Sequence, residues 1–327
     1  MNFDLDDEQR DLAAAARDFL ADAAAPANAR EALDSGARGA VPPGRDELVK
    51  SGFATITIAE SAGGGGGTLL DLAVVAEQAG RVLAGPSLVT YARAAELFAE
   101  SPTQLEALAG GGLALAVVDA GSPVLDAIGA DTFVALRDGD IVCGAGTVTE
   151  REPIDPTRGL ADVAVAPDAS PVPGGPDRWA RAERVGRVIL AAEGLGAASR
   201  ALEIGVEYAK ERHAFGRAIG SYQAVKHMLV DVYVEVEQLR SLVWWAAWAA
   251  DNAPAELPLA AAAAKAAAAT TLERAAETLI QVHGGIGFTW EHDAHLYWRR
   301  AKVDRFLLGD DVAAFDEVAR IAMEGAR

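Results

Sequence analysis

The sequence predicts a mostly α-helical protein with a small β region between two helical parts. Three observations support this prediction. Helical spacing of apolar residues dominates up to about residue 110, short apolar runs separated by Gly, Pro and Asp follow, and long helical segments fill the remainder. We therefore predict an N-terminal helical domain over 1–110, a small middle β domain over 111–178 and a C-terminal four-helix bundle over 179–327.

The N-terminal part begins with an amphipathic pattern. Leu5, Leu12 and Phe19 recur at heptad-like spacing, which predicts a helix over about 4–25. Five consecutive glycines at 63–67 are interpreted as a flexible connector, because glycine loses the most conformational entropy on ordering. Further helical patterns in this part cover 46–51, 69–83 and 88–99.

The middle and C-terminal parts differ in their hydrophobic period. Short β-like runs predict strands at 113–118, 132–136, 140–144 and 161–166. The helical period then predicts helices at 179–211, 221–251, 255–282, 291–305 and 310–325. Ser221 has the side chain of an N-cap for the second of these helices.

Composition and charge exclude several classes of protein. With 29 Lys and Arg against 48 Asp and Glu, the net charge is −19, which disfavours binding to nucleic acid or to an anionic membrane. The single cysteine, Cys143, cannot form an internal disulfide. The N-terminus is acidic, and the most apolar stretches, 241–250 and 257–270, are too short or are interrupted by Lys265, so we expect a cytoplasmic protein without a membrane span.

Two loops carry the residues most suited to binding an anion. One is "ERHAFGRAIG" at 211–220, where Arg212 and Arg217 offer fork-shaped donors for phosphate oxygens. The other is "QVHGGIGF" at 281–288, whose glycines allow a ligand to approach the backbone N–H groups. Taken singly, a glycine run after a helix is more often a C-cap, and an Arg on a loop is more often a solvated charge.

Three stretches in order resemble the signatures of the acyl-CoA dehydrogenases: "GGGGGTLLDLAVVAEQAGR", "ERHAFGRAIGSYQAVKH" and "QVHGGIGFTWEHDAHLYWRRAK". The resemblance covers nearly the whole chain and implies that family's fold. It also implies FAD bound across a subunit interface, with the flavin ring on one protomer and the adenosine diphosphate part held by its neighbour. By resemblance, the residues that hold the cofactor are Arg212, Phe215, Gln223, Gln281, Gly284, Gly285 and Gly287.

The pattern departs from the family where the catalytic base belongs. The family's reaction removes a proton from the α carbon of an acyl-CoA thioester, which requires a positioned carboxylate. Alignment by the motifs puts Leu308 in the usual base position and Gly186 in the position that some members use instead. Neither can accept a proton, so no catalytic residue is predicted.

The middle region departs as well. The Thr-Glu-Pro, Gly-Ser-Asp and Trp-Ile-Thr runs that contact the flavin ring in the family are absent, and "VVDAGSPVLDAIGADTF" stands in their place. These departures resemble the smaller, non-catalytic subunit of actinobacterial heteromeric (α2β2) acyl-CoA dehydrogenases of steroid side-chain degradation. The resemblance implies an auxiliary subunit that completes the FAD site of a larger catalytic partner, which supplies the base and holds most of the acyl-CoA.

Three alternatives remain open from the sequence. A self-sufficient homomeric enzyme could use Glu183 or Glu193 as a relocated base, unless Glu183 is solvated beside Arg187 and Glu193 pairs with a residue such as Arg200.

The second alternative is a metal site at Glu291, His292 and His295, but acid and His pairs near a helix start are commonly solvated, and no metal is predicted. The third is a cofactor-free helical scaffold. Trp244, Trp245 and Trp248 favour a core or a subunit interface under every hypothesis.

Overall fold

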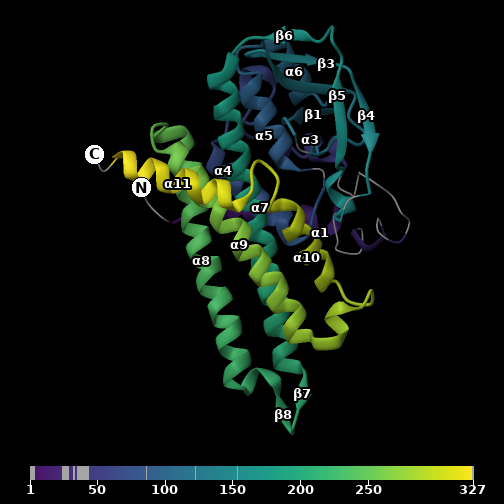
Figure 1. Cartoon of the computed structure of the whole chain (residues 1–327), viewed down its shortest axis with the longest axis vertical. Helices are drawn as coiled ribbons and strands as arrows, with labels where there is room; N and C mark the ends of the chain where they lie inside the picture. Colours follow the sequence, from purple (N-terminus) through teal and green to yellow (C-terminus); the bar gives the residue numbers. More distant parts are fainter. Residues whose placement is uncertain are drawn as a thin grey trace.

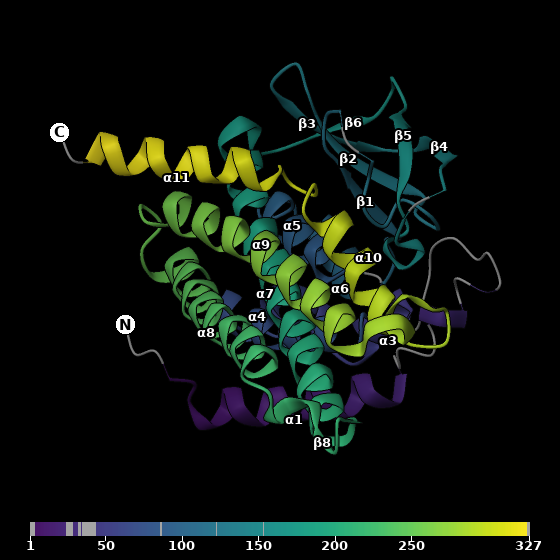
Figure 2. The same cartoon turned by 60° about the horizontal axis from the view of Figure 1, so that its bottom comes forward.

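The computed structural model describes the chain apart from residues 1–3, 24–28, 32–33, 35–43, 86, 122, 153 and 326–327. Long helices run side by side down the longest direction of the molecule, and the strands and the N-terminal helices gather around their upper half (Figure 1). Figure 2 shows the strands and the first helix on opposite sides of these long helices. Within the described residues, no helix has the length and apolar character needed to cross a lipid bilayer.

The N-terminal part is a cluster of short helices. Its elements are α1 (Asp7–Ala23), α3 (Arg45–Lys50), η1 (Phe53–Thr55), η2 (Glu60–Ala62), α4 (Leu69–Arg81), α5 (Leu88–Leu97) and α6 (Pro102–Ala109). Helix α4 begins with a capping box, in which the Thr68 hydroxyl accepts from the Asp71 N–H and the Asp71 carboxylate accepts from the Thr68 N–H at 2.8 Å. Helix α6 was not predicted.

The five glycines at 63–67 form an ordered loop, so the prediction of a flexible connector is wrong. Four of their amides, from Gly64 to Gly67, donate to carbonyls of residues 55–59 at 2.8–3.2 Å. A Cβ on Gly64 would lie 2.2 Å from the Ile58 carbonyl oxygen. The glycines are therefore needed because two backbone segments pack directly against each other.

The middle part consists of two small sheets. Strands β1 (Leu115–Val118), β2 (Thr132–Arg137), β3 (Asp140–Gly144) and β6 (Ser170–Val172) form one sheet in the order β1-β2-β3-β6, and β4 (Gly146–Glu150) pairs with β5 (Ala161–Val165) in the other. Strand β1 is parallel to β2, and all other pairs are antiparallel. A short helix, η3 (Pro156–Arg158), precedes β5 and positions a buried arginine described below.

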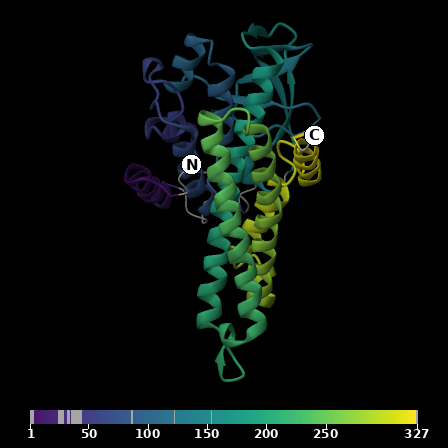
Figure 3. The same ribbon diagram turned by 90° about the vertical axis from the view of Figure 1, so that its left-hand side faces the viewer.

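The long helices are α7 (Gly175–Glu211), α8 (Gln223–Asn252) and α9 (Leu257–His283), followed by α10 (Ala294–Asp304) and α11 (Asp311–Gly325). All five were predicted from the helical period. A hairpin of β7 (His213–Ala214) and β8 (Arg217–Ala218), continued by η4 (Ile219–Ser221), closes the lower end of the bundle (Figure 3). One continuous apolar core extends from Leu20 in α1 to Tyr297 in α10.

Helices α4 and α7 cross at backbone contact, and glycines make this possible. A Cβ on Gly80 of α4 would lie 1.9 Å from the Glu193 carbonyl oxygen, and a Cβ on Gly196 of α7 would lie 1.8 Å from that of Glu77. Gly194, by contrast, would place its Cβ at ordinary contact distance, 3.5 Å from Ala268. The close crossing therefore depends on two of these three glycines.

We expect Gly196→Ala to lower the free energy of unfolding by about 1–3 kcal/mol, because the methyl group forces the two helices apart. Gly194→Ala, two residues away on the same helix, is the matched control; it has room for a methyl group and should be neutral or stabilising by about 0.5 kcal/mol. Urea denaturation followed by circular dichroism measures both. Equal effects of the two variants would contradict the close crossing.

Candidate functional site

The two anion-binding loops predicted from the sequence lie at the same end of the bundle. Helix α7 leads into the hairpin, and α9 leads into η5 (Gly284–Phe288). The two helix ends are joined by the Tyr208 and His283 rings, which stack with centroids 4.0 Å apart, and His292 continues the contact at 4.1 Å from His283. Arg212 follows Tyr208 by one helical turn, so the structure brings both loops to one surface, which we call the bundle tip.

The hairpin is held firmly while its central aromatic side chain points into solvent. Phe215 and Gly216 both have positive φ, 52° and 79°, as a two-residue type I′ turn requires. The Tyr222 hydroxyl donates to the Ala214 carbonyl at 3.0 Å, and the Arg217 guanidinium lies 3.9 Å from the centre of the Tyr222 ring. Phe215 is nevertheless 97% exposed, which indicates a surface that another group covers.

Arg212 and Gln223 are exposed on either side of this hairpin. Among the described residues, no carboxylate forms an ion pair with the Arg212 guanidinium. The Arg212 donors are thus free for an external anion.

The prediction that Ser221 caps α8 is wrong, because the cap position is Tyr222 and the Ser221 hydroxyl donates to the Ala218 carbonyl at 2.7 Å.

The three glycines of η5 stand at their positions for different structural reasons. Gly284 adopts φ 61° and ψ −137°, where a side chain would be strained. Gly287 is buried, and a Cβ there would lie 2.8 Å from the Ile280 carbonyl oxygen. A Cβ on Gly285 would meet no described heavy atom within 4 Å. The fold therefore requires Gly284 and Gly287, whereas the exposed Gly285 leaves the backbone open to a group from outside the chain.

A cavity of about 440 Å³ opens beside Gln281, between α9 and α10. It is lined by Glu277, Ile280, Gln281, Gly287, Phe288, His295, Trp298 and Arg299. Gln281 and Gly287 thus belong both to the predicted cofactor site and to this cavity. Phe288 belongs to the quoted glycine motif and His295 to the metal alternative, but the sequence gave no signal that Glu277 and Ile280 of α9 and Trp298 and Arg299 of α10 would meet them in one cavity.

The two base positions implied by the family resemblance meet at one point in the opposite half of the molecule. A Cβ on Gly186 would lie 3.0 Å from Leu308 Cδ1 and 2.7 Å from Arg93 Cδ. Arg93 is buried and forms a two-pronged ion pair with Asp119, at 2.6 and 2.7 Å. Because Arg93 and Leu308 occupy this point, a longer side chain at Gly186 would have no room.

The space left beside Leu308 is small. The cavity there measures about 20 Å³ and is lined mainly by apolar side chains together with Thr90, Arg93 and Asp119. A cavity of this size holds about one water molecule, far less than an acyl chain requires. Asp119 is the carboxylate that sequence reasoning missed at this position, and its oxygens are engaged by Arg93.

The two acids considered as relocated bases are also engaged, and neither lines the cavity beside Leu308. Glu183 pairs with Arg187 at 2.7 Å, and Arg187 also donates to the Leu308 carbonyl at 2.9 Å. Glu193 is fully buried. Its carboxylate accepts from Arg158 at 2.7 Å, from the Ser87 hydroxyl at 2.9 Å and from the Leu88 N–H at 3.2 Å, so the suggested pairing with Arg200 is wrong.

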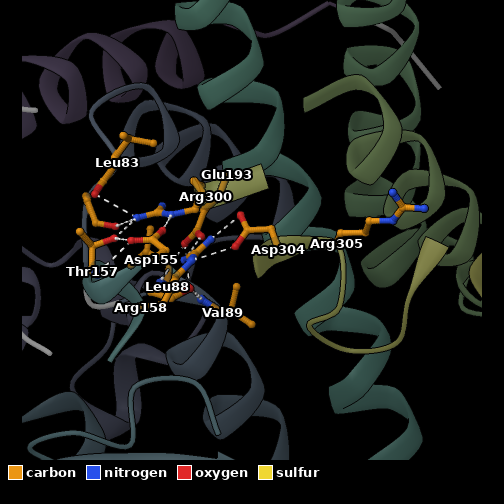
Figure 4. A network of polar contacts seen from close by, with 12 residues as sticks. Leu83, Leu88, Val89, Asp155, Thr157, Arg158, Glu193, Arg300, Asp304 and Arg305 are labelled. Atoms are coloured by element: carbon orange, nitrogen blue, oxygen red, sulfur yellow. Dashed lines mark hydrogen bonds and ion pairs between the residues drawn. The ribbon is translucent and has the colours of Figure 1, made fainter. Parts of the chain in front are cut away.

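Glu193 belongs to a buried ionic network that joins several elements (Figure 4). Arg158 from η3 binds Glu193 of α7 and, through two nitrogens at 2.7 and 2.9 Å, Asp304 of α10. Arg300 of α10 binds Asp155 at 2.7 Å and the Leu83 carbonyl at 3.1 Å. Although burial opposes ionisation, Asp304 and Glu193 raise the pKa of Arg158, so the guanidinium stays charged.

Lys265 of α9 supports the same region. It is buried, and its ammonium donates to the carbonyls of Asp304 and Arg305 at 2.9 and 3.0 Å. These carbonyls end α10 just before Leu308. Burial lowers the pKa of Lys265 to about 8.

Both histidines of the metal alternative have aromatic neighbours. His292 packs against His283 at an interplanar angle of 43° and accepts from the Ala294 N–H at 3.1 Å, and Trp290 packs edge-on against His295 with centroids 5.0 Å apart. In the part of the chain that the structure describes, no group of three or more His, Cys, Asp or Glu residues could hold a metal ion.

The three tryptophans of α8 are half-buried and pack against the main core. Trp245 also donates from its indole nitrogen to Glu256 at 2.8 Å. This packing accounts for the aromatic patch on α8 without a ligand.

The middle part carries a further cavity of about 400 Å³, where the family's flavin-ring contacts would lie by resemblance. Its polar groups are Asp119, Asp162 and Arg151, and the last two form an ion pair at 2.5 Å. Asp119 is paired with Arg93 as well, so neither carboxylate is unpaired, and the lining contains no Ser or Thr hydroxyl. The lining therefore does not reproduce the hydroxyl contacts that the family resemblance implies for the flavin ring.

The fold and these two regions define an acyl-CoA dehydrogenase-like chain. Residues 6–103 match the acyl-CoA dehydrogenase N-terminal domain, and residues 180–323 match the acyl-CoA dehydrogenase C-terminal domain. The chain is 40% identical to acyl-CoA dehydrogenase IpdE2 of Mycobacterium tuberculosis, over 76% of this chain and 77% of that protein. It is 38% identical to IpdE2 of Mycolicibacterium smegmatis, over 79% and 80%.

Solved structures agree. A chain of the ChsE4–ChsE5 complex from Mycobacterium tuberculosis superposes with a TM-score of 0.85 at 26% identity, covering 100% of this chain and 99% of that one. A chain of the Tcur3481–Tcur3483 steroid ACAD gives 0.84 at 26%, covering 98% of each. The chain therefore belongs to the acyl-CoA dehydrogenase family, as its motifs predict.

Because Lys265 has a lower pKa in the folded chain than the unfolded value of about 10.4, the unfolded chain binds more protons between these values. The penalty for a charged Lys265 is present below pH 8 and is relieved as the pH rises from about 8 to about 10.4. We expect the free energy of unfolding of wild type to rise relative to that of Lys265→Met over this range, by up to about 1.4 kcal/mol per pH unit. Urea denaturation at several pH values measures it, with exposed Lys50→Met as the control; a constant difference would contradict the assignment.

Proposed function

We propose that this chain is the auxiliary subunit of an FAD-dependent acyl-CoA dehydrogenase, and that it completes the FAD site of a larger catalytic partner. The observation that carries this proposal is the contrast between the two regions. The position of the family's base is filled by Arg93 and Leu308, whereas at the bundle tip all of the predicted cofactor-binding residues except the buried Gly287 are exposed. The partner would supply the base, the flavin-ring contacts and most of the acyl-CoA site.

The bundle tip fits the nucleotide half of FAD in charge and in shape. Arg212 has a free guanidinium on an exposed loop, and a diphosphate is an anion that Arg recognises with two parallel hydrogen bonds. Gly285 lets a ligand approach the backbone closely, and Phe215 offers an aromatic face that none of the described residues covers. With Gln223, Gln281, Gly284 and Gly287, these residues would hold the adenosine diphosphate part.

The chemistry would then be divided between two chains. Bound FAD would supply the acceptor for the hydride that leaves the thioester's β carbon. The residues of this chain would bind and orient the nucleotide, while the Arg93–Asp119 pair and Leu308 keep this chain's own acyl site closed. A carboxylate on the partner would take the α proton.

The relatives support a heteromeric assembly and a steroid-derived substrate. Two similar solved structures are of the ChsE4–ChsE5 complex and of Tcur3481–Tcur3483, which is named a steroid ACAD. By this similarity we infer an α2β2 assembly that dehydrogenates a steroid side-chain CoA ester. The three-part division at residues 110 and 178 remains part of the same proposal.

Purified alone, the chain should be colourless or only faintly yellow and should not dehydrogenate acyl-CoA esters, because the family's two base positions hold Gly186 and Leu308 and the described part of the middle region does not reproduce the family's flavin-ring contacts. Co-expressed with its catalytic partner, it should co-purify with about one FAD per pair of unlike chains. Visible absorbance at the flavin bands and turnover with an artificial electron acceptor measure both. Stoichiometric FAD and turnover in the lone chain would instead support a self-sufficient enzyme, and co-purification without FAD would support a scaffold.

Arg212→Ala should weaken FAD retention in the assembled complex by roughly 1.5–3 kcal/mol, or more than tenfold, because it removes charge-assisted hydrogen bonds to the diphosphate. Flavin released on dilution or gel filtration measures the effect. Arg10→Ala is the matched control, since Arg10 is a surface arginine paired with Asp4 and Asp7 on α1. If both variants retain FAD like wild type, the assignment of Arg212 fails.

A further inference from the structure

The first turn of α10 is capped by an imidazole ring. The helix begins at Ala294, and the side chain of Asp293, which occupies its cap position, accepts no hydrogen bond from it. The Ala294 N–H donates instead to Nδ1 of His292 at 3.1 Å. Because the first N–H groups of a helix have no partner within the helix, His292 satisfies one of the groups that would otherwise remain unpaired.

This hydrogen bond determines where the proton of His292 lies. An N–H group donates only to a ring nitrogen that carries no hydrogen, so Nδ1 is unprotonated and the single proton of the neutral ring is on Nε2. Protonation of Nδ1 would turn two donors toward each other and break the cap. It would also place a positive charge at the N-terminus of α10, where the helix dipole is already positive.

His292 also connects the start of α10 to the bundle tip. Its ring centroid lies 4.1 Å from that of His283, which in turn stacks on Tyr208 at 4.0 Å. Nδ1 of His283 donates to the Leu279 carbonyl at 2.8 Å, so this ring is fixed to α9. The glycine loop of η5 runs from His283 to His292, and the contact between the two rings therefore closes the loop at its base.

The charges around His292 favour the neutral ring. Burial lowers the pKa of His292, and Arg30 of the N-terminal segment lowers it further. Asp293 acts in the opposite direction, but its carboxylate is paired with Arg30 at 2.5 Å. The nearby rings of His283 on α9 and His295 on α10 also have pKa values lowered by burial. A proton on His292 would therefore meet further donors and cations rather than a free carboxylate.

We propose that His292 is a positioning residue of the bundle tip and an acid-sensitive cap, which holds the η5 loop in place while its ring is neutral and releases the loop when the ring is protonated. The consequence for the cofactor rests on the proposed function, because the loop carries three of the glycines assigned to FAD. FAD retention in the assembled complex should therefore decrease as the pH falls below about 6.5, where an ordinary histidine takes up a proton.

Hydrogen exchange of the isolated full chain measures the release without any cofactor. Protection of peptides over residues 284–293, corrected for the intrinsic exchange rate at each pH, should fall by up to about tenfold per pH unit below about 6.5, because the released loop binds a proton that the capped loop excludes. Mass spectrometry at about pH 7.5 and about pH 5.5 gives both values.

Two variants separate the cap from the ring contact. His292→Asn keeps an acceptor oxygen near the place of Nδ1 but takes up no proton, so its loop should stay protected in acid. His292→Phe keeps an aromatic ring beside His283 but has no acceptor, so its loop should be poorly protected at both pH values. His227→Asn, in an exposed histidine of α8, is the matched control and should behave like wild type.

The outcomes distinguish this inference from the proposed function. Equal protection of the wild-type loop at both pH values overturns the inference, as does an acid-induced loss in His292→Asn that matches wild type. Full protection in His292→Phe at neutral pH also overturns it, because the ring contact alone would then hold the loop. A complex that retains FAD equally at both pH values refutes the inference and leaves the proposed function intact. A lone chain that shows the acid release, in a complex that never contains FAD, supports the cap and refutes the proposed function.

Discussion

The buried guanidinium of Arg158 is the interaction on which the arrangement of the molecule depends. It comes from a short helix in the middle part and binds one carboxylate on α7 and one on α10, while Arg300 returns from α10 to Asp155. Buried ion pairs contribute less to net stability than their number suggests, because both partners lose hydration. Their effect is geometric: losing one partner would leave a buried charge uncompensated at a cost of about 3–5 kcal/mol, so only one placement of α10 is compatible with this network.

Fixing α10 has opposite consequences at its two ends. At its C-terminal end, Lys265 donates to the carbonyls of Asp304 and Arg305 and Arg187 donates to that of Leu308, and this places Leu308 against Gly186 and the buried Arg93. The space beside Leu308 is thereby reduced to a cavity of about 20 Å³. At its N-terminal end, α10 forms one wall of an open cavity beside the glycines of η5. A single rigid helix thus separates a region that excludes ligands from one that is open to them.

The sequence was sufficient for the long elements because their periodicity repeats over many residues; all the long helices and four of the strands lie close to their predicted ranges. The sequence did not predict elements that show no readable period, nor structure that depends on one specific contact between residues. The three-residue β6 and the two-residue strands of the hairpin around Phe215 are too short to show a period, α6 and β4 were also not predicted, and the ordered glycine loop depends on a backbone contact with Ile58. Family motifs could name Arg212 and Gln281, but Arg158 and Asp304 are 146 residues apart, and nothing in the pattern pairs them.

The exposed bundle tip also bears on how two subunits would assemble. Phe215, Phe288 and Trp290 are all more than half exposed, yet the chain carries a net charge of −19, which opposes association with another acidic chain. If the diphosphate of FAD pairs with Arg212 while the flavin ring of the same molecule reaches the partner, FAD contacts both chains. It then binds the assembled pair better than either chain alone. By thermodynamic linkage, the ligand then strengthens the assembly by the same factor by which assembly strengthens ligand binding. On this argument the cofactor is a structural element of the interface as well as a reactant.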